Sequence, residues 1–440
     1  MIRKLEMENL TYAFPEVAFD EDYVLATYAA KVSTHNIEKL AMAIAAEQTT
    51  GTWIKVGADS LEKTKRFGSK IVALYEVPDI GNDWQSDEPP MYVIQVAYPM
   101  ENFSTSMSAI ETILFGNISA SGMIKLIDVA FPKKFIDKFQ GPKFGVEGLK
   151  DAIGVKDRNR PLLNAMIKPN IGWTPDEGAD LFYHACKGGV DVIKDDELML
   201  ADGPFCPLEE RVKKFMAMEK RVYEEKGEHS LYAVNVSDNT DKVKENAYRV
   251  LEAGGNCLMV NVYTTGHDTL KMLADDPNIN VPILAHVNYA GTMAASTYTG
   301  ISAPVIIGKL TRLAGGDFQI NGHPYGKFPV LHKIFYRTFK FFTQPWWHIK
   351  PMMYACSGGT TQMAVEKIVK EIGTDIMLAA GGGVHGHPDG SEAGAKSMRQ
   401  AIDAAMKDIP VTEYAKDHPE LARMLAFLNP DLKKNFDLMQ

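Results

Sequence analysis

The sequence predicts a (β/α)₈ TIM barrel preceded by a smaller α+β domain. From about residue 160, apolar runs alternate with amphipathic helical segments, and eight runs can be counted, most of them starting roughly 25–40 residues apart. Before residue 135, strands and helices follow one another without this regular alternation. Eight βα repeats of this length are typical of a barrel of ordinary size, and a chain of 440 residues is too long for one compact core.

Three regions are expected along the chain. Residues 1–135 should form an α+β, ferredoxin-like domain, residues 136–415 the catalytic barrel, and residues 416–440 a helical tail. Within the first region, the residue pattern predicts strands at 23–32, 69–77 and 90–99 and helices at 36–48 and 103–116.

The eight barrel strands are expected where short apolar runs lie between helical segments. These runs are 161–168, 189–194, 230–236, 257–262, 282–287, 317–320, 352–357 and 375–380. Apolar residues at helical spacing in "PLEERVKKFMAMEKRVYEEKG" and "GTTQMAVEKIVKEIG" predict two of the intervening helices.

Composition excludes several classes of partner. The chain is 45% hydrophobic and 23% charged, and its net charge of −9 argues against nucleic acid or an anionic membrane as a partner. No apolar run reaches membrane-spanning length, and the N-terminus lacks a signal-like apolar core. The four cysteines lie far apart without a C-x-x-C pair, which favours reduced thiols and a cytoplasmic location.

Polar residues gather at the predicted C-terminal ends of the strands, where barrel enzymes carry their chemistry. They are Lys168, the run Lys194-Asp195-Asp196-Glu197, His286, Lys327 in the loop after strand 6, Ser357-Gly358-Gly359 and Gly381-Gly382-Gly383. A solvated turn can explain any one of these features alone. It does not explain a lysine, a carboxylate cluster, a histidine and two glycine turns at one mouth of a barrel.

Each residue type has a chemical task at such a site. Asp196 and Glu197 supply oxygen ligands, which suit Mg²⁺. Lys194 would repel the metal as an ammonium, but after its neutral amine adds CO₂ the carbamate is an anionic oxygen ligand. The turns at Gly358-Gly359 and Gly381-Gly382 can present backbone N–H groups to a phosphate, the usual task of loops 7 and 8 in this fold.

At this point the chain resembles the large chain of the RuBisCO superfamily over nearly all of its length. The resemblance is carried by "GGVDVIKDDE", "IKPNIG", "GPKFGVEGL", "SGG" and "AGGGVHGHPDG" at matching spacing. It implies that carbamylated Lys194 binds Mg²⁺ with Asp196 and Glu197. It also implies that Lys168 handles protons at the enediol, that His286 is the strand-5 histidine and that Lys327 is the mobile-loop lysine, with Ser357, Gly381 and Gly382 facing substrate and phosphate.

The resemblance also implies an assembly. The stretches "EQTTGTW" and "FGNI" provide the N-terminal residues that complete the partner subunit's site in this family, namely Glu47, Thr52, Trp53 and Asn117. An obligate homodimer with shared active sites is therefore expected, and a higher oligomer stays open.

Three departures from a true carboxylase predict a different substrate. Asn170 stands where the family has a second lysine, Val287 where it has an arginine, and Ile320 where it has a histidine. The arginine and histidine grip the second phosphate of ribulose 1,5-bisphosphate. Each lost charged hydrogen bond removes about 1.5–3 kcal/mol, so a small monophosphorylated substrate is expected instead.

Longer matches favour one branch, the methionine-salvage 2,3-diketo-5-methylthiopentyl-1-phosphate enolases. They include "GMIKLIDVAFP", "VPILAH" and "AAGGGVHGHP". Those enolases carry their base lysine where this chain has Asn117, and they usually lack lysines at Lys168 and Lys327. The preferred interpretation is Mg²⁺-dependent enolisation of a monophosphorylated ketone.

Other interpretations stay open. One is decarboxylation of a branched 3-oxo-acid sugar phosphate, of the 3-oxo-isoapionate 4-phosphate type, because loss of CO₂ also gives an enediolate. Another is phosphosugar isomerisation, and a non-enzymatic alternative is a metal-binding scaffold. His385 and His387 are expected to have structural roles in their loop.

Overall fold

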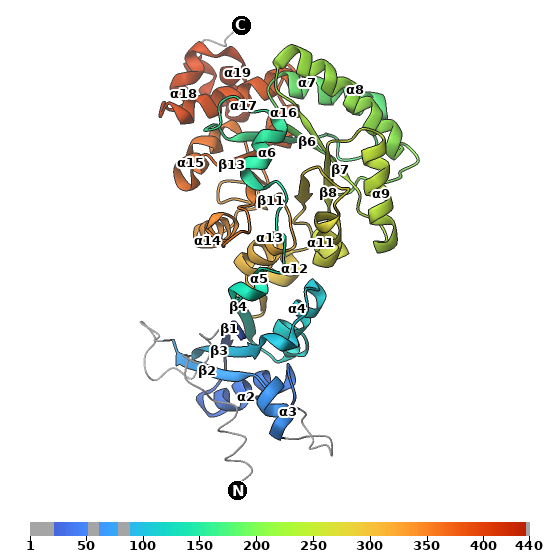
Figure 1. Ribbon diagram of the computed structural model, residues 1–440. Helices are drawn as coiled ribbons and strands as arrows, with labels where there is room; N and C mark the ends of the chain where they lie inside the picture. Colours follow the sequence, from blue (N-terminus) through green and yellow to red (C-terminus); the bar gives the residue numbers. More distant parts are fainter. Residues whose placement is uncertain (1–21, 52–60, 78–88, 437–440) are drawn as a thin grey trace. The chain divides into compact units, whose positions relative to one another are not determined.

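The computed structural model describes residues 22–51, 61–77 and 89–436, which form two compact units (Figure 1). The first unit contains the described residues up to Phe139 together with Tyr289–Leu310. The second contains Gln140–Asn288 and the described chain from Thr311 onward.

The first unit is built on a five-stranded sheet. Its order is β10 (Gly300–Ile301), β4 (Ile124–Ala130), β1 (Tyr23–Lys31), β3 (Met91–Pro99) and β2 (Lys70–Glu76). The pairs β1–β3, β1–β4 and β2–β3 are antiparallel, whereas β10 runs parallel to β4. Alternate residues of β1 are buried, as the two-residue period of a half-covered strand requires. One of them, Tyr28, donates its hydroxyl to Leu114 O at 2.6 Å.

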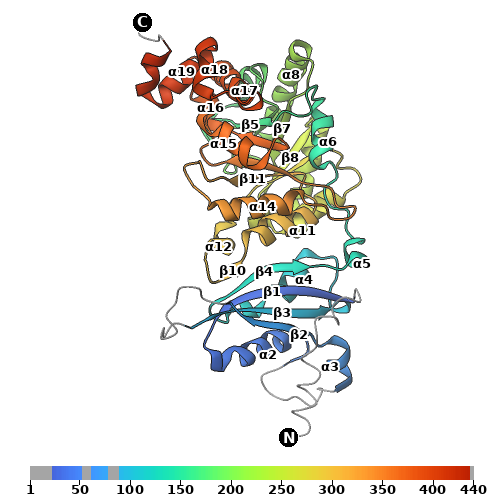
Figure 2. The ribbon, with the colours of Figure 1, turned by 90° about the vertical axis from the view of Figure 1, so that its left-hand side faces the viewer.

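Short helices accompany this sheet. They are α2 (Ile37–Glu47), α3 (Leu61–Phe67), α4 (Met107–Phe115), α5 (Lys133–Ile136) and α12 (Gly291–Ala294). Helix α2 buries Ile37, Ala41, Ile44 and Ala45 on one face and packs along β2 and β3 (Figure 2). The strands and helices that the sequence predicts in this unit are all present. Strand β4 was not predicted, and β10 comes from a part of the sequence assigned to the barrel.

The second unit is a closed barrel of eight parallel strands, which confirms the predicted fold class. The strands are β5 (Leu162–Met166), β6 (Val192–Lys194), β7 (Leu231–Asn235), β8 (Cys257–Val260), β9 (Ile283–Ala285), β11 (Phe318–Gly322), β12 (Met353–Ser357) and β13 (Ile376–Ala379). All eight apolar runs of the sequence become these strands. Each strand pairs with its sequence neighbours in the barrel, and β13 pairs with β5 to close it.

Helices connect the strands and extend the C-terminus. They are α7 (Pro175–Lys187), α8 (Leu208–Lys226), α9 (Thr240–Glu252), α10 (Val262–Thr265), α11 (His267–Asp275), α13 (Thr311–Leu313), α14 (His332–Thr343), α15 (Gln362–Ile372), α16 (Gly381–His385), α17 (Ser391–Met406), α18 (Val411–Tyr414) and α19 (Pro419–Leu428). Among the described residues, none of the helices is long and apolar enough to cross a membrane.

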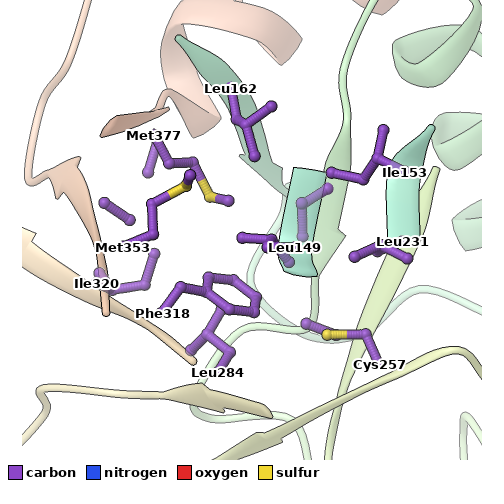
Figure 3. Close-up of a cluster of buried hydrophobic side chains, with 14 of the residues drawn as sticks. Leu149, Ile153, Leu162, Leu231, Cys257, Leu284, Phe318, Ile320, Met353 and Met377 are labelled. Carbon is purple, nitrogen blue, oxygen red and sulfur yellow. The ribbon is translucent and has the colours of Figure 1, made fainter. Parts of the chain in front are cut away.

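A further helix, α6 (Gly145–Ile153), contributes to the barrel core. Its Leu149 and Ile153 point into a cluster with inward-facing side chains of the strands, including Leu162, Leu231 and Phe318 (Figure 3). Asp317, next to this cluster, accepts backbone N–H groups of Phe144 and Gly145 and so fixes the start of the helix. The barrel core next to α6 is therefore apolar, and the polar residues lie at the C-terminal ends of the strands.

Candidate active site

Along most barrel strands, one inward-facing residue is apolar and the next inward-facing residue, two positions later, belongs to a mainly polar layer. Core residues Val192, Ala233, Met259, Leu284, Ala355 and Ala379 belong to the buried cluster. Because side chains alternate across a strand, the next inward positions are two residues further on. They are Lys194, Asn235, Asn261, His286, Ser357 and Gly381. Of these, Lys194, His286, Ser357 and Gly381 were predicted from the sequence, and the strands bring them to one end of the barrel.

Lys194 and Glu197 form the centre of this polar layer. Lys194 Nζ lies 3.2 Å from Glu197 Oε2 and donates to the backbone oxygen of Asp195 at 2.8 Å. The same Glu197 oxygen lies 3.2 Å from His286 Nε2. The lysine side chain is 1% exposed, so its charge depends on this carboxylate.

Asp196 and Lys168 form a second pair beside the first. Lys168 Nζ lies 3.1 Å from Asp196 Oδ2 and also donates to Asn170 Oδ1. Asp196 Oδ1 accepts the backbone N–H of Leu198 at 3.2 Å. Five predicted site residues, from the ends of strands β5, β6 and β9 and the loop after β6, are therefore gathered in two contact groups, and the consecutive residues Asp196 and Glu197 belong one to each.

Asp195 points away from this cluster, although it stands between two of its members. It accepts hydrogen bonds from Arg211 Nη2 at 3.2 Å, from Asn235 N at 2.9 Å and from the Tyr232 hydroxyl. Both Asp195 and Arg211 are fully buried. This carboxylate therefore anchors the loop after β6, and only the next two carboxylates face the site.

Burial and charge set the protonation of the cluster. Burial lowers the pKa of Lys194, although the Glu197 and Asp196 carboxylates oppose this effect. Burial alone would raise the pKa of Glu197, but the charges of Lys194 and His286 and the hydrogen bonds to the carboxylate together lower that pKa to about 2. Burial, with help from Lys194, lowers the pKa of His286 to about 3.

His286 is therefore a neutral imidazole at physiological pH. The backbone N–H of Asn288 donates to its Nδ1 at 3.2 Å, which places the ring proton on Nε2. Nε2 lies 3.2 Å from Glu197 Oε2, so the neutral ring borders the carboxylate.

The glycine turns bring backbone segments into close contact. Gly359 has φ +106°, and a Cβ there would lie 2.7 Å from the backbone nitrogen of Lys327. That nitrogen donates to Gly358 O at 2.7 Å. A Cβ on Gly381 would lie 3.2 Å from Lys168 Cε. Gly359 is thus required by close approach, and a side chain at position 381 would press against Lys168. Gly382, by contrast, is exposed with no heavy atom near its Cβ position.

The remaining predicted residues do not join the cluster. Lys327 is exposed, and its ammonium lies 5.0 Å from the centre of the Phe328 ring. In the first unit, Asn117 Nδ2 donates to Glu47 Oε1 at 2.9 Å, so these two predicted residues are partners of each other. Thr52 and Trp53 lie outside the described residues.

Two site residues were missed from the sequence. Asn261 Nδ2 donates to the backbone oxygen of Glu197 at 3.2 Å, and Asn235 Nδ2 donates to that of Met199 at 2.9 Å. Both amides therefore hold the loop that carries the carboxylates. They occupy the same strand parity as Lys194 and His286, and that spacing was the signal that could have found them.

Both parts of the chain match one protein family. Residues 145–428 match the catalytic domain of the ribulose bisphosphate carboxylase large chain, and residues 11–135 match its N-terminal domain. The chain belongs to the RuBisCO large-chain family. It is 44% identical to a ribulose bisphosphate carboxylase-like protein of Archaeoglobus fulgidus over 92% of this chain and 93% of that protein.

Named enzymes are also among the relatives of this RuBisCO-family chain. A 2,3-diketo-5-methylthiopentyl-1-phosphate enolase of Bacillus thuringiensis is 36% identical over 89% of this chain and 94% of that protein. The solved structure of a RuBisCO-like protein (MtnW) from Alicyclobacillus acidocaldarius aligns with a TM-score of 0.83 and 33% identity over 92% and 99% of the two chains.

Solved carboxylases of the family have different assemblies. The octameric RuBisCO of Pyrococcus horikoshii aligns with a TM-score of 0.85 and 30% identity, over 93% of this chain and 94% of that one. A dimeric archaeal RuBisCO from Hyperthermus butylicus aligns with a TM-score of 0.83 and 29% identity, over 96% and 98% of the two chains.

The three departures from a carboxylase have clear structural settings. Ile320 is 4% exposed and belongs to the apolar cluster of the barrel (Figure 3). Val287 is half-buried directly after His286, and Asn170 is exposed and accepts from Lys168. None of these three side chains carries a charge that could hold a second phosphate.

Proposed function

We propose that this RuBisCO-like chain catalyses Mg²⁺-dependent enolisation of a monophosphorylated ketone. The observation that carries the proposal is the presence of two contact groups, Lys168–Asp196 and Lys194–Glu197–His286, at the strand ends. The apolar side chains at Val287 and Ile320 support a substrate with one phosphate. The best candidate substrate is 2,3-diketo-5-methylthiopentyl 1-phosphate, in line with the named enolases at 36% identity.

The residues present fit a magnesium ion once Lys194 is carbamylated. Among the described residues, no three His, Cys, Asp or Glu side chains come together as a ready-made metal site. Asp196 and Glu197 supply two carboxylates, and a carbamate on Lys194 would supply a third anionic oxygen donor. Carbamylation would also remove the one ammonium held directly against Glu197.

The chain's own residues have separate tasks in this proposal. Bound Mg²⁺ would polarise two adjacent oxygens of the substrate and so acidify the neighbouring C–H bond. Lys168 would move the proton, because its amine stands at the edge of the cluster and is only partly buried. His286 would orient Glu197, and the turns at Gly358-Gly359 and Gly381-Gly382 would bind the phosphate.

The assembly proposed for the enzyme is a homodimer with shared sites. Glu47 and Asn117 are hydrogen-bonded to each other, and with Thr52 and Trp53 they would complete the site of the other subunit. The dimeric and octameric carboxylases among the solved relatives support assembly of this kind.

Hydrogen–deuterium exchange at the acidic carbon tests the function. The protein is incubated with Mg²⁺, bicarbonate and 2,3-diketo-5-methylthiopentyl 1-phosphate in D₂O, and loss of the C–H signal is followed by ¹H NMR. Exchange that disappears on adding EDTA supports enolisation. In a parallel incubation with a branched 3-oxo-acid sugar phosphate, CO₂ release is measured. CO₂ release from this compound without proton exchange of the diketone would favour the decarboxylase function over the enolase function.

A further inference from the structure

The loop that carries Lys327 begins with a buried histidine. His323 directly follows β11 and is fully buried. Its Nδ1 accepts the backbone N–H of Tyr325 at 3.1 Å, and its Nε2 lies 2.9 Å from Thr360 Oγ1. Thr360 stands directly after the Gly358-Gly359 turn and is also buried. The ring therefore contacts the loop with one nitrogen and the residue behind the glycine turn with the other.

The direction of these hydrogen bonds fixes the state of the ring. The Thr360 hydroxyl donates to Cys356 O in β12 at 2.8 Å, so its oxygen accepts from His323 Nε2. Nδ1, which accepts from Tyr325, then carries the lone pair of a neutral imidazole. Burial lowers the pKa of His323 to about 4, in agreement with a neutral ring. A chain of hydrogen bonds thus runs from the loop backbone through the histidine to strand β12.

The loop also touches the turn through its backbone. Lys327 N donates to Gly358 O at 2.7 Å. A Cβ on Gly326 would lie only 2.4 Å from the same oxygen, so this close approach of two backbones requires a glycine. Val330 N donates to His323 O at 3.4 Å, which closes the loop on itself.

A third set of contacts joins the loop to α15, the helix that follows the turn. The Tyr325 hydroxyl donates to Glu371 Oε2 at 2.8 Å. The other oxygen of Glu371 lies 3.1 Å from Nδ1 of His332, the first residue of α14 after the loop. The loop is thus held near both of its ends.

The backbone contact sets the direction of the glycine turn. In a planar trans peptide, the C=O group and the following N–H group point in opposite directions. Because Gly358 O faces Lys327 N, the N–H of Gly359 points away from the loop. Gly359 is exposed, and within the described chain its N–H has no backbone acceptor. This N–H is therefore free to bind an anion.

We propose that His323 is a positioning residue that fastens the Lys327 loop to the glycine turn after β12, so that loop and turn form one pre-formed unit. The proposal rests on the function proposed above, in which this turn binds the substrate phosphate. The Gly359 N–H then keeps its direction in the free protein, and the loop does not need to close over the substrate.

The first test reads the loop directly and needs no substrate. Hydrogen–deuterium exchange of peptides covering residues 323–331 is followed by mass spectrometry. These peptides should be protected in the free wild type and should exchange about tenfold faster in His323→Leu and in Thr360→Val, since each variant breaks a buried hydrogen bond. Thr360→Ser keeps the hydroxyl and should stay close to the wild type.

Thr269→Val is the matched control for Thr360→Val. Thr269 is also buried and also donates to the backbone oxygen four residues earlier, that of Thr265 at 2.7 Å, but it lies on α11. This variant should leave exchange of the loop unchanged. Equal exchange in the wild type and in Thr360→Val would overturn the proposal. So would a wild-type loop that is unprotected until inorganic phosphate is added, because such a loop would be a lid.

The second test asks whether the fastening serves the substrate. In the C–H exchange assay, Thr360→Val should raise KM for the diketone phosphate by about three- to tenfold and change kcat by less than about twofold, as expected when binding alone is weakened. Thr360→Ser should restore KM, and Thr269→Val should not alter it. An unchanged KM in Thr360→Val, despite a faster-exchanging loop, would remove the positioning role.

Failure of the proposed function gives a different result. A wild-type protein that shows no C–H exchange would count against enolisation alone, because the exchange of the loop amides would still report whether His323 fastens the loop.

Discussion

Glu197 and His286 are joined by a contact of 3.2 Å between Oε2 and Nε2, which links the loop after the second barrel strand to the end of the fifth. The histidine is neutral, and the carboxylate keeps its charge beside the Lys194 ammonium. The same oxygen faces Lys194 at the same distance. The orientation of this one carboxylate is thus set from two strands before any metal binds.

Replacing that carboxylate should remove metal binding. Glu197→Gln has nearly the same shape but lacks the negative charge, so affinity for Mg²⁺ in the presence of bicarbonate should fall by about 100-fold or more. Calorimetric titration with Mg²⁺ measures this directly. Glu224→Gln, at an exposed position on α8, is the matched control and should bind Mg²⁺ like the wild type. Equal affinities for the two variants would exclude Glu197 as a ligand.

Activity should require CO₂ as well as Mg²⁺. Lys194 can become an oxygen ligand only as its carbamate, so protein kept in CO₂-free buffer should lose metal-dependent exchange and regain it slowly when bicarbonate is added. Lys194→Ala should be inactive under both conditions. Rates that do not depend on bicarbonate would show that the lysine acts without carbamylation.

Asp195 should matter for stability more than for chemistry. Asp195→Asn removes the carboxylate that is paired with Arg211 at a fully buried position, and it weakens the bonds to Tyr232 and to the Asn235 backbone. Breaking a buried pair of this kind costs about 3–5 kcal/mol in the free energy of unfolding. Urea unfolding followed by circular dichroism gives the value, and a loss well below 1 kcal/mol would contradict this role.

The sequence predicted the barrel correctly because its apolar residues recur at regular spacing. The eight apolar runs became eight strands, and the polar residues at their ends met because parallel strands of a barrel finish at one mouth. Asp196 and Glu197 were expected to be the ligands, but no role was expected for Asp195, because side-chain direction in a loop depends on tertiary partners such as Arg211.

Elements that are very short, or that pair with a distant part of the chain, were not predicted from the sequence. Strand β10 is two residues long and joins β4 from a segment some 170 positions later, so no local pattern could show it. Within the described chain, His385 Nε2 is buried without a hydrogen-bond partner, and this depends on which atoms surround the ring, whereas the sequence shows only a histidine in a glycine-rich loop.

A shared site should be visible by complementation. Lys168→Ala and Asn117→Ala change residues of the two different units, so each homodimer should be impaired in both of its sites. A mixed dimer would regain one intact site if the N-terminal unit of one subunit serves the barrel of the other. Heterodimers carrying two affinity tags can be purified and assayed for C–H exchange. No recovery in confirmed heterodimers would count against sharing.

The most direct measurement of the central claim compares two reactions in one preparation. The protein, loaded with Mg²⁺ and bicarbonate, is given ribulose 1,5-bisphosphate with radiolabelled bicarbonate, and separately a monophosphorylated diketone in D₂O. Asn170, Val287 and Ile320 provide no cation for a second phosphate, whereas Lys168, Lys194, Asp196, Glu197 and His286 are together at the strand ends. We expect exchange of the carbon-bound proton of the diketone and no label in 3-phosphoglycerate. Steady incorporation of label into 3-phosphoglycerate, without exchange of the diketone, would contradict the proposed function.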